Sequence, residues 1–555
     1  MATVRATIEE FIYPHLEYFT KMVYEGGMDT EFMGIRVMDD DSRFTHGALV
    51  NGACILYAHY CEVGDPREDE ARERLLKFIR IAASGACKTW GKLGILRGFN
   101  TLFDAGLLDN IPEELVELIK VKTEYDDFFD KENMKLRGMA TNYLQVAMAC
   151  AGFRERLGWE NDGYAAKISE ILLGILKNGA VDGWMDDELP HGRFDRYSLI
   201  LTSEYADTMN AIGLPVPESV LCNLKRSAEE FLFAANRSGD GVIYGRSVAC
   251  HGDATGAECI SSALACGLID EERIAEAIAY SHAVIKKITE FWYDSRRRSF
   301  NIWFDGRSTN YYRSIARVLE VNIDMAIHLF STLANFKRAA LADTEVGEVL
   351  RRPKKWEARE IKFVDYADNA KSLVMLRRGD VLINLPFVGH GKAWIKRASY
   401  YAFPAVHRLI EASPIAEYPF MIPEYTDKDG NIFRVCQYFD AVEVTSSEDG
   451  AKIRATGNLA KISCDIPEMS DYRFEITFEI ENTSIKMRCK AYGELFVVST
   501  VLGANDPRVK ITAVGYEKSE KFHGVCDAIH SRLLWLERYE GKNTELVGYD
   551  IELPI

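Results

Sequence analysis

The sequence predicts an α+β protein with two domains. The first is an α/α toroid, an incomplete barrel of paired helices, and the second is a C-terminal antiparallel β-sandwich. Between about residues 3 and 338, apolar residues recur at steps of three and four, which is the period of an amphipathic helix. The pattern changes around residues 337–360, and beyond them apolar and polar residues alternate with the period of strands.

The helical half consists of many segments of similar length. Clear helical periods occupy residues 47–60, 70–83, 139–154 and 164–177. Connectors rich in Gly, Pro and Asp separate the segments, for example at 64–66, 106–112 and 213–217. Paired helices with short loops favour a toroid, and no sharp repeat supports a solenoid. We expect this domain to span residues 1–345.

A charged, proline-containing segment at residues 351–355 predicts a linker over residues 346–360. The strand-like runs that follow occupy residues 372–385, 441–445, 472–481, 485–492 and 495–502. Alternation between turn dipeptides is typical of antiparallel sheet with one face on a core. We therefore expect a β-sandwich over residues 361–555.

Composition narrows the class of protein. With 555 residues and 47% hydrophobic residues, the chain can bury a large core. The net charge of -17 argues against a nucleic-acid or membrane-surface partner, although a basic cleft for an acidic sugar is compatible with it. The first residues lack the features of a signal peptide, and no apolar run is long enough to span a bilayer. If residue 1 is the natural start, these features predict a cytoplasmic protein.

Cysteines and acidic clusters offer no obvious metal site. Most of the 12 cysteines stand singly in apolar segments, as at Cys54, Cys150, Cys266 and Cys489, which predicts small buried thiols in a reducing compartment. The aspartates at 39–41 predict a helix-capping turn, because calcium-loop spacing is absent. We expect no required cofactor. A divalent metal and a homo-oligomer both stay open.

The stretch from Val181 to Glu258 gathers the polar and aromatic residues of two short loops. Function commonly resides in such loops on a rigid scaffold. The first loop contains Asp182-Gly183-Trp184 and then Phe194-Asp195-Arg196-Tyr197-Ser198-Leu199. The second contains Tyr244-Gly245-Arg246-Ser247 and is followed by His251.

These segments resemble the toroid loops of heparinase II/III-like polysaccharide lyases and of uncharacterised bacterial toroid proteins akin to them. The resemblance covers about residues 130–270 in motif and the whole chain in layout. It implies a lyase that cleaves a uronic-acid-containing polysaccharide or oligosaccharide by β-elimination. That reaction needs one group to neutralise the uronate carboxylate and another, a tyrosine or histidine, to take the C5 proton.

The resemblance implies that Tyr197 protonates the leaving oxygen and also serves as a candidate base. A tyrosine is a poor base unless cations such as Arg196 or Arg246 stabilise its phenolate. The resemblance also implies that Asn142 contacts the uronate carboxylate. The chain departs from the family because Tyr143 follows Asn142 where a histidine is usual, so the neutralising group stays open. A core tyrosine and a helix N-cap are the structural alternatives.

His251 and His191 are the candidate bases in the two loops. Arg246 and Arg196 could bind carboxylates through the planar guanidinium group, or pair with nearby aspartates such as Asp253. Aromatic side chains stack on sugar rings, and arginines bind acidic sugars. The candidate substrate-binding residues are Arg196, Tyr244, Trp184, Tyr311, Tyr312 and Arg313. His390 and His407, in the sandwich, are expected to be structural.

Two other functions stay open. A glycoside hydrolase on the same toroid would use paired carboxylates. The candidates are Asp186, Asp187 and Glu188 from the first loop, with Asp253 or Glu258 from the second. A non-catalytic carbohydrate-binding protein is the other alternative.

Overall fold

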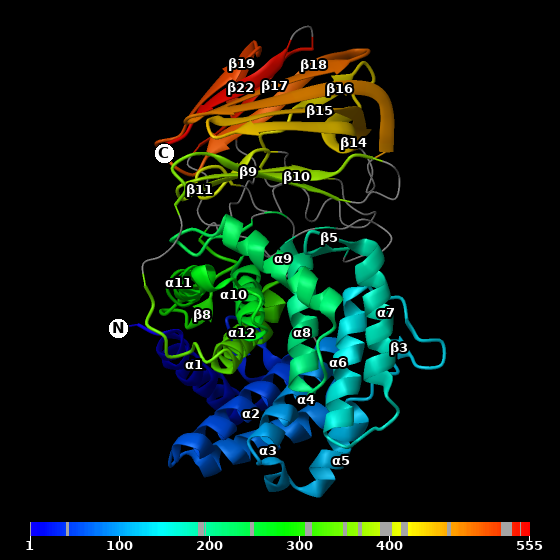
Figure 1. Ribbon diagram of the computed structural model, residues 1–555, viewed down its shortest axis with the longest axis vertical. Helices are drawn as coiled ribbons and strands as arrows, with labels where there is room; N and C mark the ends of the chain where they lie inside the picture. Colours follow the sequence, from blue (N-terminus) through cyan, green and yellow to red (C-terminus); the bar gives the residue numbers. More distant parts are fainter. Residues whose placement is uncertain are drawn as a thin grey trace.

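The computed structural model describes residues 2–39, 44–186, 194, 196–242, 244, 249–305, 314–347, 352–363, 369–388, 402–411, 420–462, 468–522, 535–543 and 546–554. The N-terminal part is helical and the C-terminal part is built from antiparallel sheets (Figure 1). The predicted α/α toroid followed by a β-sandwich is therefore confirmed.

Six helices form the wall of a central ring. Each of them contacts the next in chain order, and the last contacts the first, which closes the ring. They are α2 (Thr45–Val63), α4 (Thr89–Asp104), α6 (Asn142–Arg156), α8 (Leu201–Ala211), α10 (Cys250–Ala265) and α12 (Val318–Arg338). The alternating helices pack outside them: α1 (Val4–Gly26), α3 (Glu68–Ser84), α5 (Glu113–Lys122), α7 (Tyr164–Gly179), α9 (Glu218–Ala234) and α11 (Ile274–Lys286).

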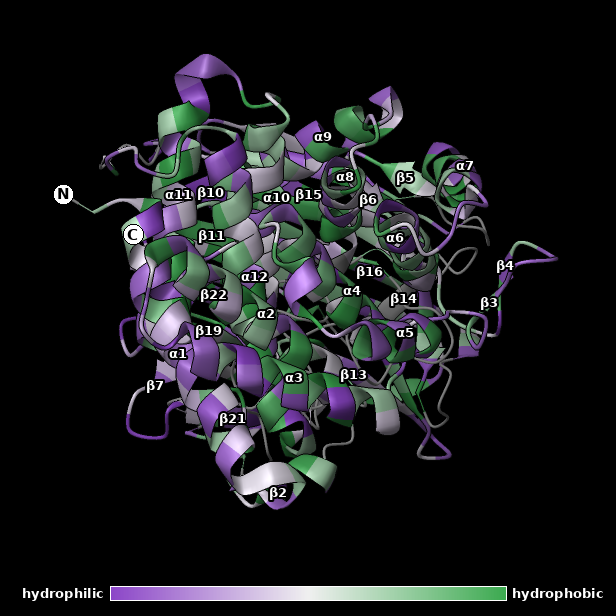
Figure 2. Cartoon of the chain, turned by 90° about the horizontal axis from the view of Figure 1, so that it is seen from below, coloured by the Kyte–Doolittle hydropathy of each residue, from purple (hydrophilic) through white to green (hydrophobic). Residues whose placement is uncertain are grey.

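Burial distinguishes inner from outer helices. All residues of α10 from Cys250 to Leu264 are buried, as expected for a helix surrounded by protein. In α3 the buried positions, such as Ala71, Leu75 and Phe78, recur at three- and four-residue steps. Hydrophobic and hydrophilic residues alternate along the ribbon of α3 (Figure 2). The two patterns are those of an inner helix, α10, and an outer helix, α3.

Small residues let inner helices approach closely. A Cβ at Gly47 of α2 would overlap the backbone of Gly91 in α4. Cys54, Cys150 and Cys489 are buried free thiols, as predicted, whereas the free thiol of Cys266 is only half-buried.

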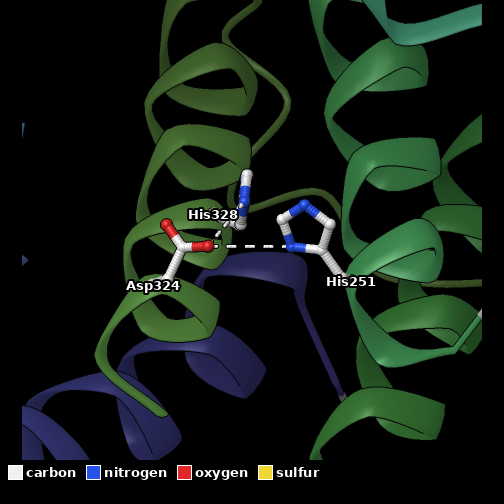
Figure 3. Close-up of side chains that lie close together, drawn as sticks. All are labelled: His251, Asp324 and His328. Atoms are coloured by element: carbon white, nitrogen blue, oxygen red, sulfur yellow. Dashed lines mark ion pairs between the residues drawn. The ribbon is translucent and has the colours of Figure 1, made fainter. Parts of the chain in front are cut away.

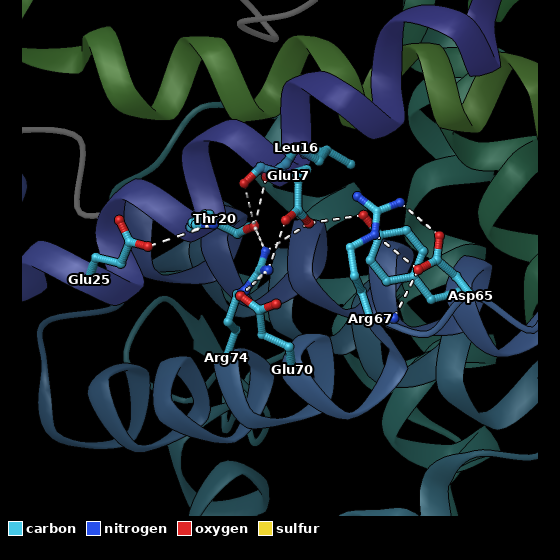
Figure 4. A network of polar contacts seen from close by, with 10 residues as sticks. Leu16, Glu17, Thr20, Glu25, Asp65, Arg67, Glu70 and Arg74 are labelled. Atoms are coloured by element: carbon cyan, nitrogen blue, oxygen red, sulfur yellow. Dashed lines mark hydrogen bonds and ion pairs between the residues drawn. The ribbon is translucent and has the colours of Figure 1, made fainter.

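A polar network fixes the outer helix α1 to α3. Arg74 of α3 is buried and donates 2.8 Å hydrogen bonds to both carboxylate oxygens of Glu17 in α1 (Figure 4). Arg74 also pairs with Glu70 at 2.7 Å, and Tyr60 of α2 donates to Glu17 at 2.9 Å. This network joins the first three helices on one side of the ring.

The C-terminal part contains two antiparallel sheets. The smaller has the order β12-β11-β10-β9, with β9 (Glu357–Lys362), β10 (Ser372–Arg378), β11 (Val381–Phe387) and β12 (Ala405–Val406). The larger has the order β19-β22-β17-β16-β15-β14-β13-β18-β21-β20. Its strands are β13 (Glu424–Asp427), β14 (Ile432–Ser447), β15 (Gly450–Lys461), β16 (Glu468–Glu481), β17 (Ser484–Tyr492), β18 (Leu495–Ala504), β19 (Lys510–Val514), β20 (Lys518–Lys521), β21 (Trp535–Lys542) and β22 (Val547–Glu552).

Aromatic side chains pack the two sheets against each other. Phe387 of β11 contacts Phe439 of β14 and Phe478 of β16, with ring centroids 5.6 and 6.1 Å apart. The last toroid helix ends at Arg338 and the first strand of this part begins at Glu357. The domain limits at residues 345 and 361 stay predictions.

The smaller sheet lies on one end of the toroid (Figure 1). Arg377 of β10 is buried and donates to the carbonyl oxygens of Leu232 and Phe233 at the end of α9. Phe363, just after β9, contacts the rings of Trp184 and Phe194. Inner and outer helices alternate along the chain, so the inner helices run parallel to one another. The segments that precede α8 and α10 meet the smaller sheet through Trp184, Phe194 and Phe233, which places the N-terminal ends of the inner helices at this covered end.

Within the described part of the chain, none of the helices is both long enough and apolar enough to cross a membrane.

Candidate active site

Several of the predicted site residues lie outside the described residues. They are His191, Arg246, Tyr311, Tyr312 and Arg313. The backbone of Tyr197 belongs to the 3-10 helix η4 (Arg196–Ile200), which contacts α10, but its side chain is not described. The structure therefore places the Tyr197 segment beside α10 at the end of the toroid that the smaller sheet covers.

Arg196 belongs to a buried ionic cluster. Its Nη2 donates to Oδ1 of Asp253 at 2.9 Å, and both side chains are almost fully buried. Lys287 pairs with Asp253 at 2.9 Å and with Asp240 at 2.7 Å, and Trp292 Nε1 donates to Asp253 at 2.8 Å. The aspartate pairing that the sequence left open for Arg196 is thus present. The cluster connects η4 to the first turn of α10.

Two candidate substrate-binding aromatics are also buried. Trp184, in the strand β6 (Trp184–Met185), is 0% exposed and packs edge-to-face against Phe363. Tyr244 is 1% exposed, and its carbonyl oxygen accepts a 2.8 Å hydrogen bond from the backbone N–H of Arg196. Trp184 lies where the toroid meets the smaller sheet, and Tyr244 lies beside η4.

Asn142 and His251 stand at the covered end of the ring. Asn142 is the first residue of α6 and is 7% exposed. His251 lies in the first turn of α10 and is 9% exposed. Because inner helices run parallel, the structure brings both residues and η4 to the same end of the toroid. Asn142, His251 and Tyr197 are three of the catalytic candidates that the sequence indicates.

His251 belongs to a chain of imidazoles and carboxylates between α10 and α12 (Figure 3). His251 Nδ1 lies 3.7 Å from Oδ2 of Asp324, and His328 Nε2 lies 3.5 Å from the same oxygen. The two imidazole rings lie 4.8 Å apart at 75°. On its other side, His328 Nδ1 lies 2.9 Å from Oε2 of Glu258. We call these four residues the axial cluster.

The carboxylates of the axial cluster control the charge of His328. Burial alone would lower the pKa of this histidine, but Glu258 and Asp324 raise it well above 6.5. We therefore expect a cationic His328 at neutral pH when only protons bind there. The side chain of Asp324 is 27% exposed, so solvent reaches the axial cluster.

A cavity of about 290 Å³ lies inside the ring and reaches Glu258 and His328. Its polar wall includes Glu204 and Asp207 of α8, Arg97 of α4 and Asn335 of α12. Burial raises the pKa of Glu204 to about 7, with Arg97 opposing and Glu258 reinforcing the shift. Burial likewise raises the pKa of Asp207 to about 6. The cavity thus offers carboxyl groups that hold protons near neutral pH.

Replacing Glu204 with Gln should stabilise the protein at alkaline pH. The native carboxyl holds its proton up to about pH 7, whereas the unfolded one loses it near 4.5, so native stability falls as pH rises between these values. We expect equal stability of variant and parent at pH 4, and a gain of the order of 1–3 kcal/mol at pH 8. Urea unfolding at the two pH values measures this. If the variant and the parent differ in stability by the same amount at pH 4 and pH 8, the raised pKa of Glu204 is contradicted.

The sequence-based choice missed Asp324, His328, Glu204 and Asp207. A usable signal exists in α12, where Asp324 and His328 are four residues apart in an apolar helix and so share a face. In α10, His251 and Glu258 are likewise two turns apart. Of the hydrolase candidates, Asp253 is paired with Arg196 and Lys287, and Asp186 is 0% exposed. Asp187 and Glu188 lie outside the described residues.

No protein-family model and no curated protein matches the sequence. Among solved structures, heparinase III is 11% identical with a TM-score of 0.49, over 92% of this chain and 76% of that one. A possible GH105 family member from Salmonella enterica serovar Paratyphi A is 14% identical, with a TM-score of 0.37 over 57% and 93% of the two chains. A polysaccharide lyase is 12% identical, with a TM-score of 0.36 over 62% and 100%. The likeness is one of fold.

Proposed function

We propose that the protein is an enzyme that acts on acidic glycans, a lyase that cleaves uronic-acid-containing oligosaccharides or polysaccharides by β-elimination. The observation that carries the proposal is the gathering of proton-transfer groups at one end of the ring. His251 in the first turn of α10, Asn142 at the start of α6 and the Tyr197 segment lie there, and the axial cluster extends from His251 toward the middle of the ring. Proton removal and carboxylate neutralisation both need such groups held on rigid elements.

The reaction itself assigns the roles. A base removes the C5 proton, the electron pair forms the C4–C5 double bond, and the C4–oxygen bond breaks as the leaving oxygen takes a proton. Tyr197 is the proposed proton-transfer group, and Asn142 and the axial cluster face the uronate carboxylate. Neutralising that carboxylate acidifies C5 because it stabilises the charge that develops in the transition state.

Ultraviolet absorbance tests the proposal directly. The new double bond is conjugated with the carboxylate and absorbs in the ultraviolet, whereas hydrolysis creates no double bond. The purified full-length chain should be incubated with a panel of uronic-acid polymers and their oligosaccharides, while absorbance and reducing ends are followed together. We expect both signals to rise in parallel with at least one substrate.

The raised pKa of Glu204 favours a second candidate, a glycoside hydrolase. A carboxyl with a pKa of about 7 facing a cavity has the property that a general acid needs, and Glu258 lines the same cavity. Reducing ends without ultraviolet absorbance would establish this function and overturn the lyase. Neither signal with any substrate, together with measurable glycan binding, would instead support the carbohydrate-binding alternative.

A further inference from the structure

Three side chains of the axial cluster direct donor atoms at a common point. Figure 3 shows His251 from α10 and Asp324 and His328 from α12 turned toward one another. His251 Nδ1, an oxygen of Asp324 and His328 Nε2 all lie within 4.8 Å of one another. Two of the separations, both to Oδ2 of Asp324, are 3.7 and 3.5 Å.

These distances suit a bound divalent ion. A tetrahedral zinc ion at about 2.1 Å from nitrogen and oxygen ligands holds those ligands about 3.4 Å apart. The two separations to Asp324 are close to this value, and the two histidine nitrogens lie within 4.8 Å of each other. Two imidazoles with one carboxylate form a donor set that first-row transition metals prefer, and with these three ligands from the described residues a tetrahedral ion has one further position.

Glu258 supplies the support that a metal-binding histidine usually has. Its Oε2 lies 2.9 Å from Nδ1 of His328, so Nδ1–H donates to the carboxylate and Nε2 points toward Asp324. A carboxylate behind a ligating histidine fixes the ring and its tautomer. Glu258 lies two helical turns after His251 on α10, so the same two packed helices carry both ligands and support.

We propose that His251, Asp324 and His328 bind a divalent transition-metal ion of the zinc type, with Glu258 orienting His328. The site goes beyond the proposed function, because nothing in β-elimination requires it. One extension rests on that function: the further position of the ion would bind the uronate carboxylate. The ion would then neutralise the uronate carboxylate, a role for which the sequence offers no histidine after Asn142, because Tyr143 stands there.

Metal binding is measured without substrate. The full-length chain is treated with a chelator, dialysed, and titrated with Zn²⁺ and, separately, Mn²⁺ by calorimetry, with bound metal counted by elemental analysis. We expect one Zn²⁺ per chain and a Tm that rises with Zn²⁺ concentration. The Co²⁺-loaded protein should show the visible absorption of a low-symmetry, four-coordinate site with nitrogen ligands.

Variants locate the ion. His251→Ala and His328→Ala should abolish the stoichiometric binding, and Glu258→Gln should weaken it by about 10–100-fold. His282→Ala is the matched control, because His282 is a half-buried histidine of α11 that contacts Thr7 and not the cluster. If His328→Ala does not fold, the Co²⁺ spectra of the unmodified chain and of His251→Ala are compared instead. Loss of the four-coordinate spectrum in His251→Ala would support the site, and an unchanged spectrum would overturn it.

The outcomes separate this inference from the proposed function. Absence of stoichiometric metal, or binding that survives both histidine substitutions, would overturn the site and leave the lyase proposal standing. Metal binding without ultraviolet-absorbing product would support the site and count against the lyase. Product formation that stops with chelator and returns with Zn²⁺ would support the site and its extension to the uronate carboxylate.

Discussion

Tyr197→Phe should lower kcat by about 10²–10⁴-fold, the usual contribution of a general acid or base, while KM changes little. The substitution removes the hydroxyl proton and keeps the ring. Its neighbours Arg196 and Ser198 are buried, and Arg196 remains paired with Asp253, so the η4 backbone should keep its place. Initial rates of ultraviolet absorbance over a range of substrate concentrations measure both constants.

The control is Tyr492→Phe, which makes the same chemical change at a 46%-exposed position of β17. It should leave both constants unchanged. If Tyr197→Phe behaves like this control in an active preparation, Tyr197 transfers no proton, and His251 becomes the stronger candidate base. If neither variant nor the parent turns over any uronate, the glycan-binding alternative gains weight.

The two-layer architecture was predictable because it depends on local patterns. The three- and four-residue period of α3 and the alternation in β16 each follow from burying one face of an element. Ring closure by α12 against α2 has no such local signal, since it depends on the accumulated angles between many helices. Four strands of the larger sheet, β14, β16, β17 and β18, coincide with runs that the sequence predicts, whereas the other strands and the order across the sheet were not predicted.

The site was predictable only in part, for a related reason. A polar loop residue gives the same sequence signal whether it faces substrate or a buried partner. Arg196 and Asp253 illustrate this, since their charges meet inside the protein. His328 was not predicted because it lacks such a polar-loop signal. It lies in an apolar helix, and its importance depends on Glu258, 70 residues earlier, and on His251.

Asp253→Ala should be the most destabilising single change at the covered end of the toroid. Asp253 is 0% exposed and accepts from Arg196, Lys287 and Trp292. Its removal leaves the Arg196 and Lys287 cations buried with less compensation and deprives the Trp292 N–H of its acceptor. Breaking a buried pair in this way costs about 3–5 kcal/mol. The urea midpoint of the helical circular-dichroism signal measures the loss.

Asp270→Ala provides the matched comparison. Asp270 pairs with Lys225 at 2.8 Å, the same kind of contact, but its side chain is 54% exposed. Water solvates Lys225 once the partner is gone, so the cost should stay below about 1 kcal/mol. Equal losses for the two variants would mean that the buried cluster adds no stability beyond a surface pair. A large loss confined to Asp253→Ala would instead show that Arg196 serves the fold, because its charge depends on this carboxylate.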